Sequence, residues 1–438
     1  MRETITVMAD LQDDALGIYI SIPFCRSKCT YCNFASGVYP ASEHAHYIDR
    51  LIEDMAATGE WATRMGVDLP RRVDSVYLGG GTPSLLAPEL LARLFGALRV
   101  RFSFDPDTEI TMECAPGQIA DETLAALVAA GVNRVSLGVQ SFIDKEAQSS
   151  GRLHSRAIVL EDLRRLRAAG ISNINVDLIA GLAGQTFASW QESLDVLKAT
   201  GVPHASVYML EVDEDSRLGR EMLSGGARYH AELVPTDDAI AAMYTTAIET
   251  LGRPGRGRLS QYEISNFSRR GHQSRHNLRY WQRRSYLGLG LDASSMLREA
   301  LADQPAPNKP APNKRATVRS EPGYVLRATT TDDLGAYLSG PQPVETAWLS
   351  PASQHEEAWF LGLRKNAGVN VAALRREFGR KMVAPAMEVV GRMVERDLLT
   401  SDGKTVRLTA QGQLLSNDVF QEFLGLPAAS AGADHLHG

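Results

Sequence analysis

The sequence predicts an α/β protein in which repeated strand–helix units build a parallel sheet, followed by a smaller and mainly helical domain. Six short apolar, β-branched runs alternate with helical patterns in the first half of the chain. Strands that alternate with helices in this way pair in parallel. Three of the helices end in a similar phrase whose glycine suits the left-handed position after a helix. From residue 351 the pattern becomes helical again.

Local signals support each unit. Pro88 suits the first turn of the helix after the second strand, and Ser155 and Thr186 can cap the helices that follow them. Periodicity alone leaves two arrangements open, a partial barrel of six units or an open sheet. The six strands are expected at 17–22, 74–78, 108–113, 133–139, 172–178 and 204–210, and the helix-ending phrases stand at 129–131, 168–170 and 199–201.

The chain divides into segments of different character. A repeat, PAPNKPAPNK, marks a flexible insertion, because Pro-rich polar repeats bury little surface. Near the C-terminus, helices are followed by a hairpin with Asp402 and Gly403 at its turn, which resembles a winged-helix arrangement. We assign a tail to 1–16, the strand–helix units to 17–225, a connecting region to 226–300, the insertion to 301–322, a C-terminal domain to 323–425 and a disordered tail to 426–438.

Composition excludes several classes of protein. The chain has 438 residues, 44% of them apolar, so a sizeable core can form. Its net charge of −6 gives no reason to expect nucleic-acid binding. No secretory signal and no apolar run of membrane-spanning length is found. We therefore expect a cytoplasmic protein, and leave peripheral contact with the inner membrane face and homodimer formation open.

Three of the four cysteines lie within eight residues, in the segment CRSKCTYC directly after the first strand. Loops at the carboxyl ends of parallel strands form the functional site of such folds. Cys25, Cys29 and Cys32 could wrap one compact iron–sulfur cluster and leave one iron open. The alternatives are a three-ligand zinc site, although structural zinc takes four ligands, or unrelated cysteines. Cys114 is expected to be a small buried residue.

The spacing CxxxCxxC, the aromatic Tyr31 before the third cysteine and the segment VYLGGGTPS after the second strand resemble the radical S-adenosylmethionine (SAM) superfamily. This resemblance implies a partial (β/α)6 barrel, a [4Fe–4S] cluster on Cys25, Cys29 and Cys32, and SAM bound to the open iron. The glycine run would let backbone N–H groups approach SAM closely.

Residues from about 17 to 425 resemble a narrower family, the oxygen-independent coproporphyrinogen III oxidase (dehydrogenase) and its relative, the HemW-type haem chaperone. The matching segments include IYISIPFC, GGGTPS, NRVSLGVQSF and EEAWFLGLRKNAGV. The resemblance implies SAM contacts at Tyr19, Tyr31, Gly80, Gly81, Thr82, Glu113, Gln140, Arg152 and Asp177. Acidic strand ends can accept from the SAM ammonium or ribose, and Arg152 can pair with its carboxylate.

Three features favour the chaperone branch over the oxidase. The oxidase carries a further cysteine two places after the third, where this chain has Phe34. It also has a long N-terminal extension, whereas only 24 residues precede Cys25. Finally, residues 262–281 resemble the chaperone's YEISNFARPG and HNxxYW segments. The second segment is present as His276, Asn277, Tyr280 and Trp281.

The resemblance makes these four residues candidates for haem binding. Imidazole can ligate haem iron, and flat aromatic rings can stack on a porphyrin. Residues 252–285 also contain nine arginines against one acid, Glu263, and guanidinium groups suit propionates. The alternative is that the aromatic rings belong to the core and the arginines to a solvated face.

The sequence therefore predicts a haem chaperone that binds haem, a [4Fe–4S] cluster and SAM. Its partners would be haem-accepting proteins such as respiratory enzymes, and a cellular reductant. The alternative is the oxidase itself, which decarboxylates coproporphyrinogen III through a 5′-deoxyadenosyl radical, and a third class is a radical SAM enzyme that modifies tRNA or a cofactor. Whether the chain is an enzyme stays open. Ser21, where histidine is usual, and Asp292, in a segment that usually reads GPGAHS, depart from the family pattern.

Overall fold

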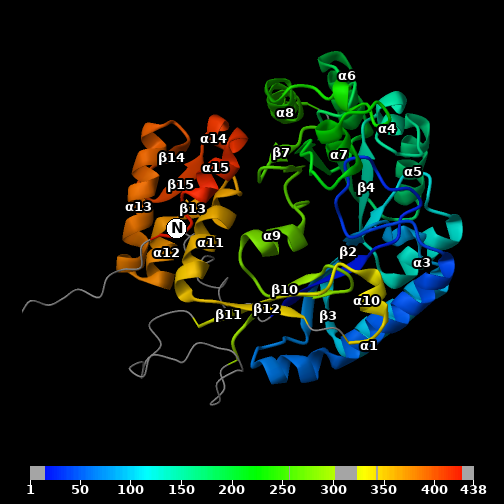
Figure 1. Ribbon diagram of the computed structural model, residues 1–438, viewed down its shortest axis with the longest axis horizontal. Helices are drawn as coiled ribbons and strands as arrows, with labels where there is room; N and C mark the ends of the chain where they lie inside the picture. Colours follow the sequence, from blue (N-terminus) through cyan, green and yellow to red (C-terminus); the bar gives the residue numbers. More distant parts are fainter. Residues whose placement is uncertain (1–14, 256, 301–322, 342–343, 427–438) are drawn as a thin grey trace, which may run out of the picture.

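The computed structural model describes residues 15–255, 257–300, 323–341 and 344–426. Its centre is a set of six parallel strands that lie side by side in chain order, as predicted (Figure 1). The strands are β1 (Leu16–Ile22), β2 (Arg72–Gly80), β3 (Ser103–Cys114), β4 (Arg134–Gln140), β5 (Asn173–Ala180) and β6 (His204–Met209). This is the partial-barrel arrangement rather than a flat sheet without a concave side, because polar side chains from β2 to β6 and the loop that follows β1 converge on one cavity described below.

Helices connect these strands and cover their outer face. Thr186 forms a capping box with Ser189 as expected, whereas Ser155 lies at its N-cap without a side-chain bond. Gly131 and Gly201 adopt the left-handed conformation that the helix-ending phrases predicted. The connecting elements are α1 (Ala41–Met65), η1 (Pro83–Leu85), α2 (Pro88–Arg101), α3 (Asp121–Ala130), α4 (Asp144–Ser149), α5 (Arg156–Ala168), α6 (Phe187–Thr200), α7 (Arg217–Ser224), η2 (Ala231–Leu233) and α8 (Asp237–Gly252).

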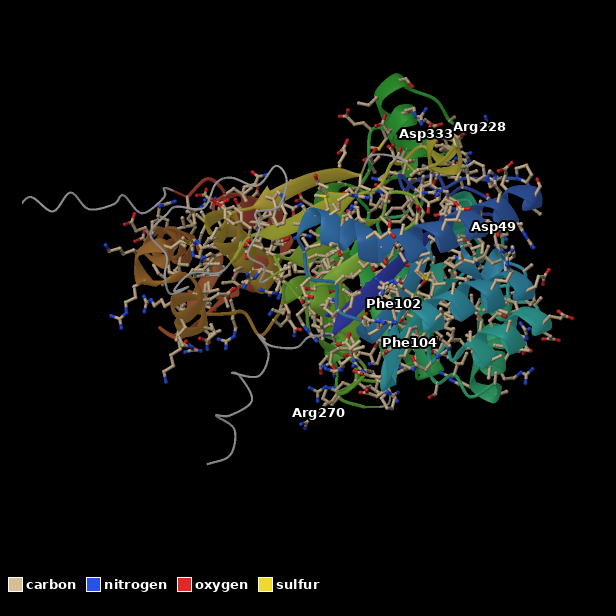
Figure 2. The ribbon with its side chains drawn as sticks, turned by 90° about the horizontal axis from the view of Figure 1, so that it is seen from below. Asp49, Phe102, Phe104, Arg228, Arg270 and Asp333 are labelled. Atoms are coloured by element: carbon tan, nitrogen blue, oxygen red, sulfur yellow. The ribbon has the colours of Figure 1, made fainter. Side chains whose placement is uncertain are left out.

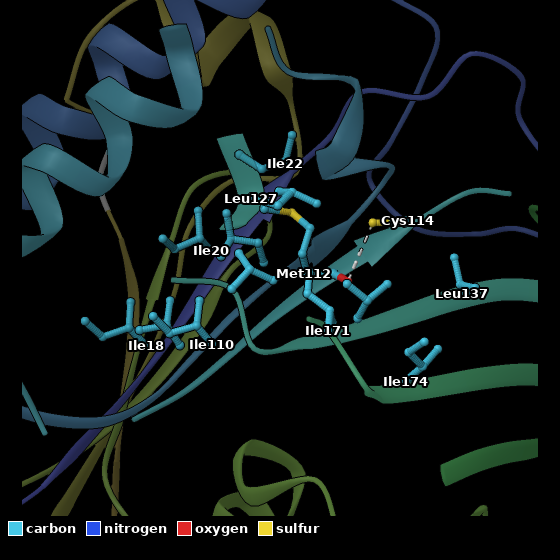
Figure 3. Close-up of a cluster of buried hydrophobic side chains, with 14 of the residues drawn as sticks. Ile18, Ile20, Ile22, Ile110, Met112, Cys114, Leu127, Leu137, Ile171 and Ile174 are labelled. Atoms are coloured by element: carbon cyan, nitrogen blue, oxygen red, sulfur yellow. Dashed lines mark hydrogen bonds between the residues drawn. The ribbon is translucent and has the colours of Figure 1, made fainter. Parts of the chain in front are cut away.

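Alternation along the strands separates an apolar core from a polar interior. Ile18, Ile20 and Ile22 are fully buried and share a core with Met112 (Figure 3). Because successive side chains of a strand point to opposite faces, the residues between these isoleucines face the concave side. Cys114 lies at the edge of the same core, where its thiol donates to the Met112 carbonyl at 3.9 Å. Burial raises the pKa of this thiol to about 12. The prediction of a small buried residue is confirmed.

The sheet is larger than the sequence predicted. β9 pairs in parallel with β1, and three antiparallel strands continue that edge. These strands were missed because they are short and are interrupted by glycines and by residues 301–322. The additional elements are β7 (Ser260–Gln261), β8 (Asn266–Ser268), α9 (Arg275–Trp281), β9 (Tyr286–Leu289), β10 (Ser294–Arg298), β11 (Val325–Thr329), α10 (Leu334–Leu338) and β12 (Glu345–Leu349), and the full order is β12-β11-β10-β9-β1-β2-β3-β4-β5-β6-β8-β7.

A second body lies beside the barrel (Figure 1). Its own core includes Trp359, which stacks on Phe423 with ring centroids 5.1 Å apart. It begins at α11 rather than at residue 323, because β11 and β12 pair with the barrel sheet. The predicted hairpin turn at 402–403 is present between β14 and β15. The elements are α11 (Pro351–Leu363), β13 (Val369–Asn370), α12 (Val371–Phe378), α13 (Arg380–Glu395), β14 (Leu399–Ser401), β15 (Thr405–Leu408), α14 (Ala410–Leu414) and α15 (Ser416–Gln421).

Some predicted segments are not covered. The insertion at 301–322 and, apart from residues 15, 16 and 426, the tails at 1–16 and 426–438 lie outside the described residues. Within the described part of the chain, none of the helices has the length and hydropathy needed to cross a bilayer.

Candidate cluster and cofactor site

The three clustered cysteines lie in the loop that follows β1 and face a cavity of about 830 Å³ at the carboxyl ends of the strands. Backbone bonds fix this loop on both sides. The Cys25 N–H donates to the Gly37 carbonyl at 2.8 Å, and the Thr30 N–H donates to the Ser150 carbonyl at 3.1 Å. Both bonds hold the loop in shape without using the thiols, which leaves Cys25, Cys29 and Cys32 available to a ligand.

The glycine run after β2 packs directly beneath this loop. The Gly81 N–H donates to the Ile22 carbonyl at 2.8 Å. A Cβ atom at Gly81 would lie only 2.7 Å from the Phe24 carbonyl oxygen, so no larger residue fits there without a backbone shift. The glycine therefore permits the close approach of two backbones that builds the floor of the cavity.

The donor set fits an iron–sulfur cluster better than a single metal ion. All three loop thiols line one cavity, and the fourth cysteine, Cys114, borders the same cavity from the end of β3 but is buried at the edge of the core. Over the described ranges, no three His, Cys, Asp or Glu side chains converge closely enough to hold one ion. A polynuclear cluster is larger than one ion and is held by thiolates set further apart. Cys25, Cys29 and Cys32 would hold it.

Eight of the nine predicted SAM-binding residues line the same cavity, and all eight lie at or just beyond the carboxyl ends of strands or in the loops there. They are Tyr31, Gly80, Gly81, Thr82, Glu113, Gln140, Arg152 and Asp177. Tyr19 is the exception: its ring lies beside that of Tyr77, with centroids 6.2 Å apart, and it does not line the cavity. The structure thus brings together residues up to 146 positions apart in the chain, from Tyr31 to Asp177.

Two of these side chains keep buried polar atoms without a partner. Gln140 adopts a left-handed backbone conformation (φ 67°), and its buried Oε1 accepts no hydrogen bond from the described residues. The Nε of Arg152 is also buried without an acceptor there, although its Nη2 donates to the Tyr31 hydroxyl at 3.2 Å. Buried polar groups are normally satisfied. These two therefore fit a polar ligand such as the amino-acid portion of SAM.

Glu113 has an environment that raises its pKa. Its Oε1 accepts from the Tyr77 hydroxyl at 2.8 Å. Burial, and to a lesser degree the neighbouring carboxylate of Asp177, raise the pKa of Glu113 to about 7. Tyr77 was missed from the sequence. The signal that could have found it is strand alternation, because Tyr77 lies opposite Tyr19 in the β1–β2 register and faces the concave side.

This raised pKa makes a prediction for SAM binding. We expect Glu113 to hold the SAM ammonium. Only its carboxylate form can do so, and a carboxyl with a pKa near 7 loses that form as the pH falls below 7. The affinity of the cluster-loaded protein for SAM should fall by roughly tenfold per pH unit below 7. Equilibrium binding between pH 6 and 8 measures this. Glu113→Gln should bind SAM weakly at every pH, and an equally steep dependence in that variant would assign the effect elsewhere.

The haem-binding candidates lie on α9, at the opposite end of the barrel interior, and none of them lines the cavity. His276 is buried, with Nδ1 at 3.1 Å from the Ser75 hydroxyl and Nε2 at 2.9 Å from the Tyr280 hydroxyl. Burial, together with the charge of Arg279, lowers the pKa of His276 to about 3. The imidazole is therefore neutral at physiological pH, and both of its nitrogens are engaged within the protein.

The other two candidates point to different neighbours. Asn277 is half-buried, and its N–H donates to the Ser274 hydroxyl that caps α9. Trp281 faces the second body, where the Arg364 guanidinium lies 4.4 Å from the centre of its ring. Its indole Nε1 is buried without an acceptor among the described residues. The signature thus joins the barrel interior, through His276, to the second body, through Trp281.

The basic segment does not form a single cationic surface. Arg279 is buried and bonds to Asp74, which also accepts from Arg284 at 3.0 Å. Arg283 pairs with Glu377 of the second body at 2.8 Å. By contrast, Arg270 extends from the edge of the molecule (Figure 2). Much of the segment therefore stabilises the barrel and joins it to the second body. Arg256 lies outside the described residues.

The two departures from the family pattern have clear local settings. Ser21 is buried, and its carbonyl accepts from the Tyr47 hydroxyl at 2.7 Å. Asp292 is exposed and has a φ of 54°, a left-handed conformation that favours glycine and tolerates aspartate. The usual glycine at this turn therefore has a conformational reason, and aspartate is among the residues that can replace it.

Comparison with known proteins identifies the family. Residues 19–197 match the radical SAM superfamily, and residues 349–415 match the HemN C-terminal domain. The chain is 30% identical to the heme chaperone HemW of Lactococcus lactis, over 93% of this chain and 96% of that protein. It is 32% identical to HemW of Bacillus subtilis, over 93% and 98%.

The solved structure of coproporphyrinogen III oxidase (HemN) from Escherichia coli has the same fold. It superposes with a TM-score of 0.75 at 19% identity, covering 95% of this chain and 92% of that one. These matches confirm the resemblance seen in the sequence and the predicted α/β fold with its mainly helical C-terminal body. The chain belongs to the radical SAM superfamily and, within it, to the family of the heme chaperone HemW.

Proposed function

We propose that the protein is a haem chaperone, which binds haem and delivers it to haem-accepting proteins such as respiratory enzymes. The observation that carries this proposal is the match to HemW proteins over nearly the whole chain, second body included. Phe34 supports it. This side chain is 63% exposed and lines the cavity at the position where the oxidase has a further cysteine.

The cofactor residues divide into two groups. Cys25, Cys29 and Cys32 would hold a [4Fe–4S] cluster, and the cavity-lining polar residues, Glu113 and Arg152 among them, would orient SAM. When bound, such a cluster supplies one electron and an open coordination site. Glu113 would hold the ammonium of SAM, and Arg152 would hold its carboxylate. Gly81 contributes no side chain to the narrow space between the cysteine loop and the end of β2.

The second candidate is oxygen-independent decarboxylation of coproporphyrinogen III. The shared fold favours it, but a likeness at 19% identity is a likeness of fold alone, and Phe34 argues against it. A cytoplasmic location, a cellular reductant for the cluster, peripheral membrane contact and a homodimer belong to the proposal as expectations.

Two measurements on the anaerobically reconstituted protein separate these functions. Titration with haem, followed by Soret absorption, should show stoichiometric binding, and mixing with an apo-form haem protein should move the haem to that acceptor. Incubation with SAM, a reductant and coproporphyrinogen III should leave the porphyrinogen unchanged. Failure to bind haem would overturn the chaperone proposal, and formation of protoporphyrinogen IX would favour the oxidase.

A further inference from the structure

The cavity that contains the cysteines extends beyond the residues expected to hold the cluster and SAM. Its outer part is lined by the end of β6, the segment 264–265 and the junction of α14 and α15, with Phe34 from the cysteine loop. Phe34, Tyr208 and Leu415 are 63%, 41% and 40% exposed, so large apolar surfaces face this space uncovered. Concave apolar surfaces with a few polar groups are typical of sites for flat organic ligands.

One cationic residue that lines the cavity makes no side-chain hydrogen bond within the described ranges. Three cationic side chains line the cavity among the described residues. Lys28 donates to the carbonyls of Phe34 and Ser36, and Arg152 donates to Tyr31. Arg364 forms no ion pair within the described ranges, and its Nε is buried without an acceptor. A guanidinium in this state is suited to an anionic group of a ligand.

Glu263 is the acid that faces Arg364, because the charge of Arg364 lowers the pKa of this carboxyl against the larger effect of burial. The Oε1 of Glu263 is already occupied: it accepts from the Ser265 N–H at 3.1 Å and from the Asn266 side chain. The Oε2 of Glu263 is buried and accepts no hydrogen bond within the described ranges. Glu263 therefore compensates part of the charge of Arg364, and the two groups share no hydrogen bond in the described part of the chain.

The position of Arg364 is fixed from two sides. Its carbonyl accepts from the Ile264 N–H at 3.1 Å, and the Asn366 N–H donates to the Tyr262 carbonyl at 3.0 Å. The central carbon of its guanidinium lies over the Trp281 ring, at 4.4 Å from the ring centre. Helix α9, which carries Trp281, lies between the barrel sheet and α11 (Figure 1). Such preorganisation lowers the entropy lost when a ligand binds.

We propose that the outer part of this cavity holds the porphyrin ring of haem, with Arg364 as the anchor for a propionate group. The apolar lining covers the porphyrin ring, and a guanidinium held in place over Trp281 can bind a carboxylate through two parallel hydrogen bonds. Trp281 of the HNxxYW signature then acts as a positioning residue through Arg364 rather than by stacking on haem. The inference rests on the proposed function and specifies the site at which it operates.

The test compares Arg364→Gln with the wild-type protein in titrations with three probes: haem, metal-free protoporphyrin IX and protoporphyrin IX dimethyl ester. Because the anchor acts on a carboxylate and not on iron, Arg364→Gln should bind the first two about 10- to 100-fold more weakly. The dimethyl ester has no propionate charge, so it should bind equally to both proteins. Arg375→Gln, which removes an exposed arginine of α12 outside the cavity, is the matched control and should bind like the wild type.

The outcomes separate this inference from the proposed function. If Arg364→Gln binds protoporphyrin IX as tightly as the wild type does, the inferred anchor is overturned. Haem binding by the wild type would still support the proposed chaperone function. An equal loss of affinity for protoporphyrin IX and for its dimethyl ester would also overturn the inferred anchor, because a general disturbance of the cavity would explain that result. If the wild type does not bind haem, both the proposed function and the inferred anchor are overturned. The melting temperature and SAM affinity of Arg364→Gln report whether the variant is folded.

Discussion

Replacement of any one of Cys25, Cys29 or Cys32 by alanine is expected to abolish stable assembly of the iron–sulfur cluster. All three thiols line one cavity, and two thiolates cannot retain a four-iron cluster against exchange with solvent thiols. Anaerobic reconstitution, followed by iron and sulfide analysis and the visible absorption of the cluster, measures the effect. We expect close to complete loss, with SAM binding lost at the same time.

Cys114→Ala is the matched control for this experiment. Cys114 is buried at the edge of the core on β3, outside the cysteine loop, and its thiol donates to the Met112 carbonyl at 3.9 Å, so we do not expect it to ligate the cluster. The variant should assemble a full cluster. Retention of full iron in one of the three loop variants, or its loss in Cys114→Ala, would contradict the assignment of the ligands.

Replacement of Asp74 by alanine is expected to cause the largest loss of stability. Asp74 accepts hydrogen bonds from two arginines, Arg279 and Arg284, and Arg279 is only 1% exposed. Removing the carboxylate leaves a buried guanidinium without its counter-charge, which costs about 3–5 kcal/mol. Urea denaturation of the wild type and Asp74→Ala measures the change in the free energy of unfolding.

Arg270→Gln provides the comparison, because Arg270 belongs to the same basic segment but is exposed at the edge of the molecule (Figure 2). Its free energy of unfolding should stay within about 0.5 kcal/mol of the wild type. Similar stabilities for Asp74→Ala and Arg270→Gln would show that the ion pairs of Arg279 and Arg284 with Asp74 do not stabilise the fold, and would return these two arginines to the set of candidate ligand-binding residues.

The sequence predicted the first six strands because each is a short apolar, β-branched run and helical patterns separate one run from the next. Strands β9 to β12 carried no such signal. β9 is the four-residue segment YLGL, and its pairing with β1 joins residues that are about 270 positions apart, which no local pattern records. The second body was predicted to begin too early, at residue 323, for the same reason. The pairing of β11 and β12 with the barrel sheet is seen only in the three-dimensional structure.

The candidate site was predictable where a residue type has one dominant use. Thiolates, a glycine run and strand-end carboxylates could be located from the residues and the family resemblance. The use of arginines could not be predicted, because a guanidinium serves equally well in a buried ion pair, as at Arg279, or beside a cavity with no ion pair among the described residues, as at Arg364. Only the positions of Asp74 and Trp281 in space distinguish these two cases.

The pairing of β1 with β9 also affects how the protein emerges from the ribosome. β1 is synthesised early, and β2 can cover one of its edges soon afterwards. Its other edge gains a partner only when residues 286–289 are made, roughly 15–50 s later at typical elongation rates. During that interval the strand that leads into the cysteine loop has one unpaired edge, which is exposed to misassociation. Chaperone binding to the nascent chain should therefore be strongest before residue 286 emerges, and a truncation that ends before β9 should aggregate.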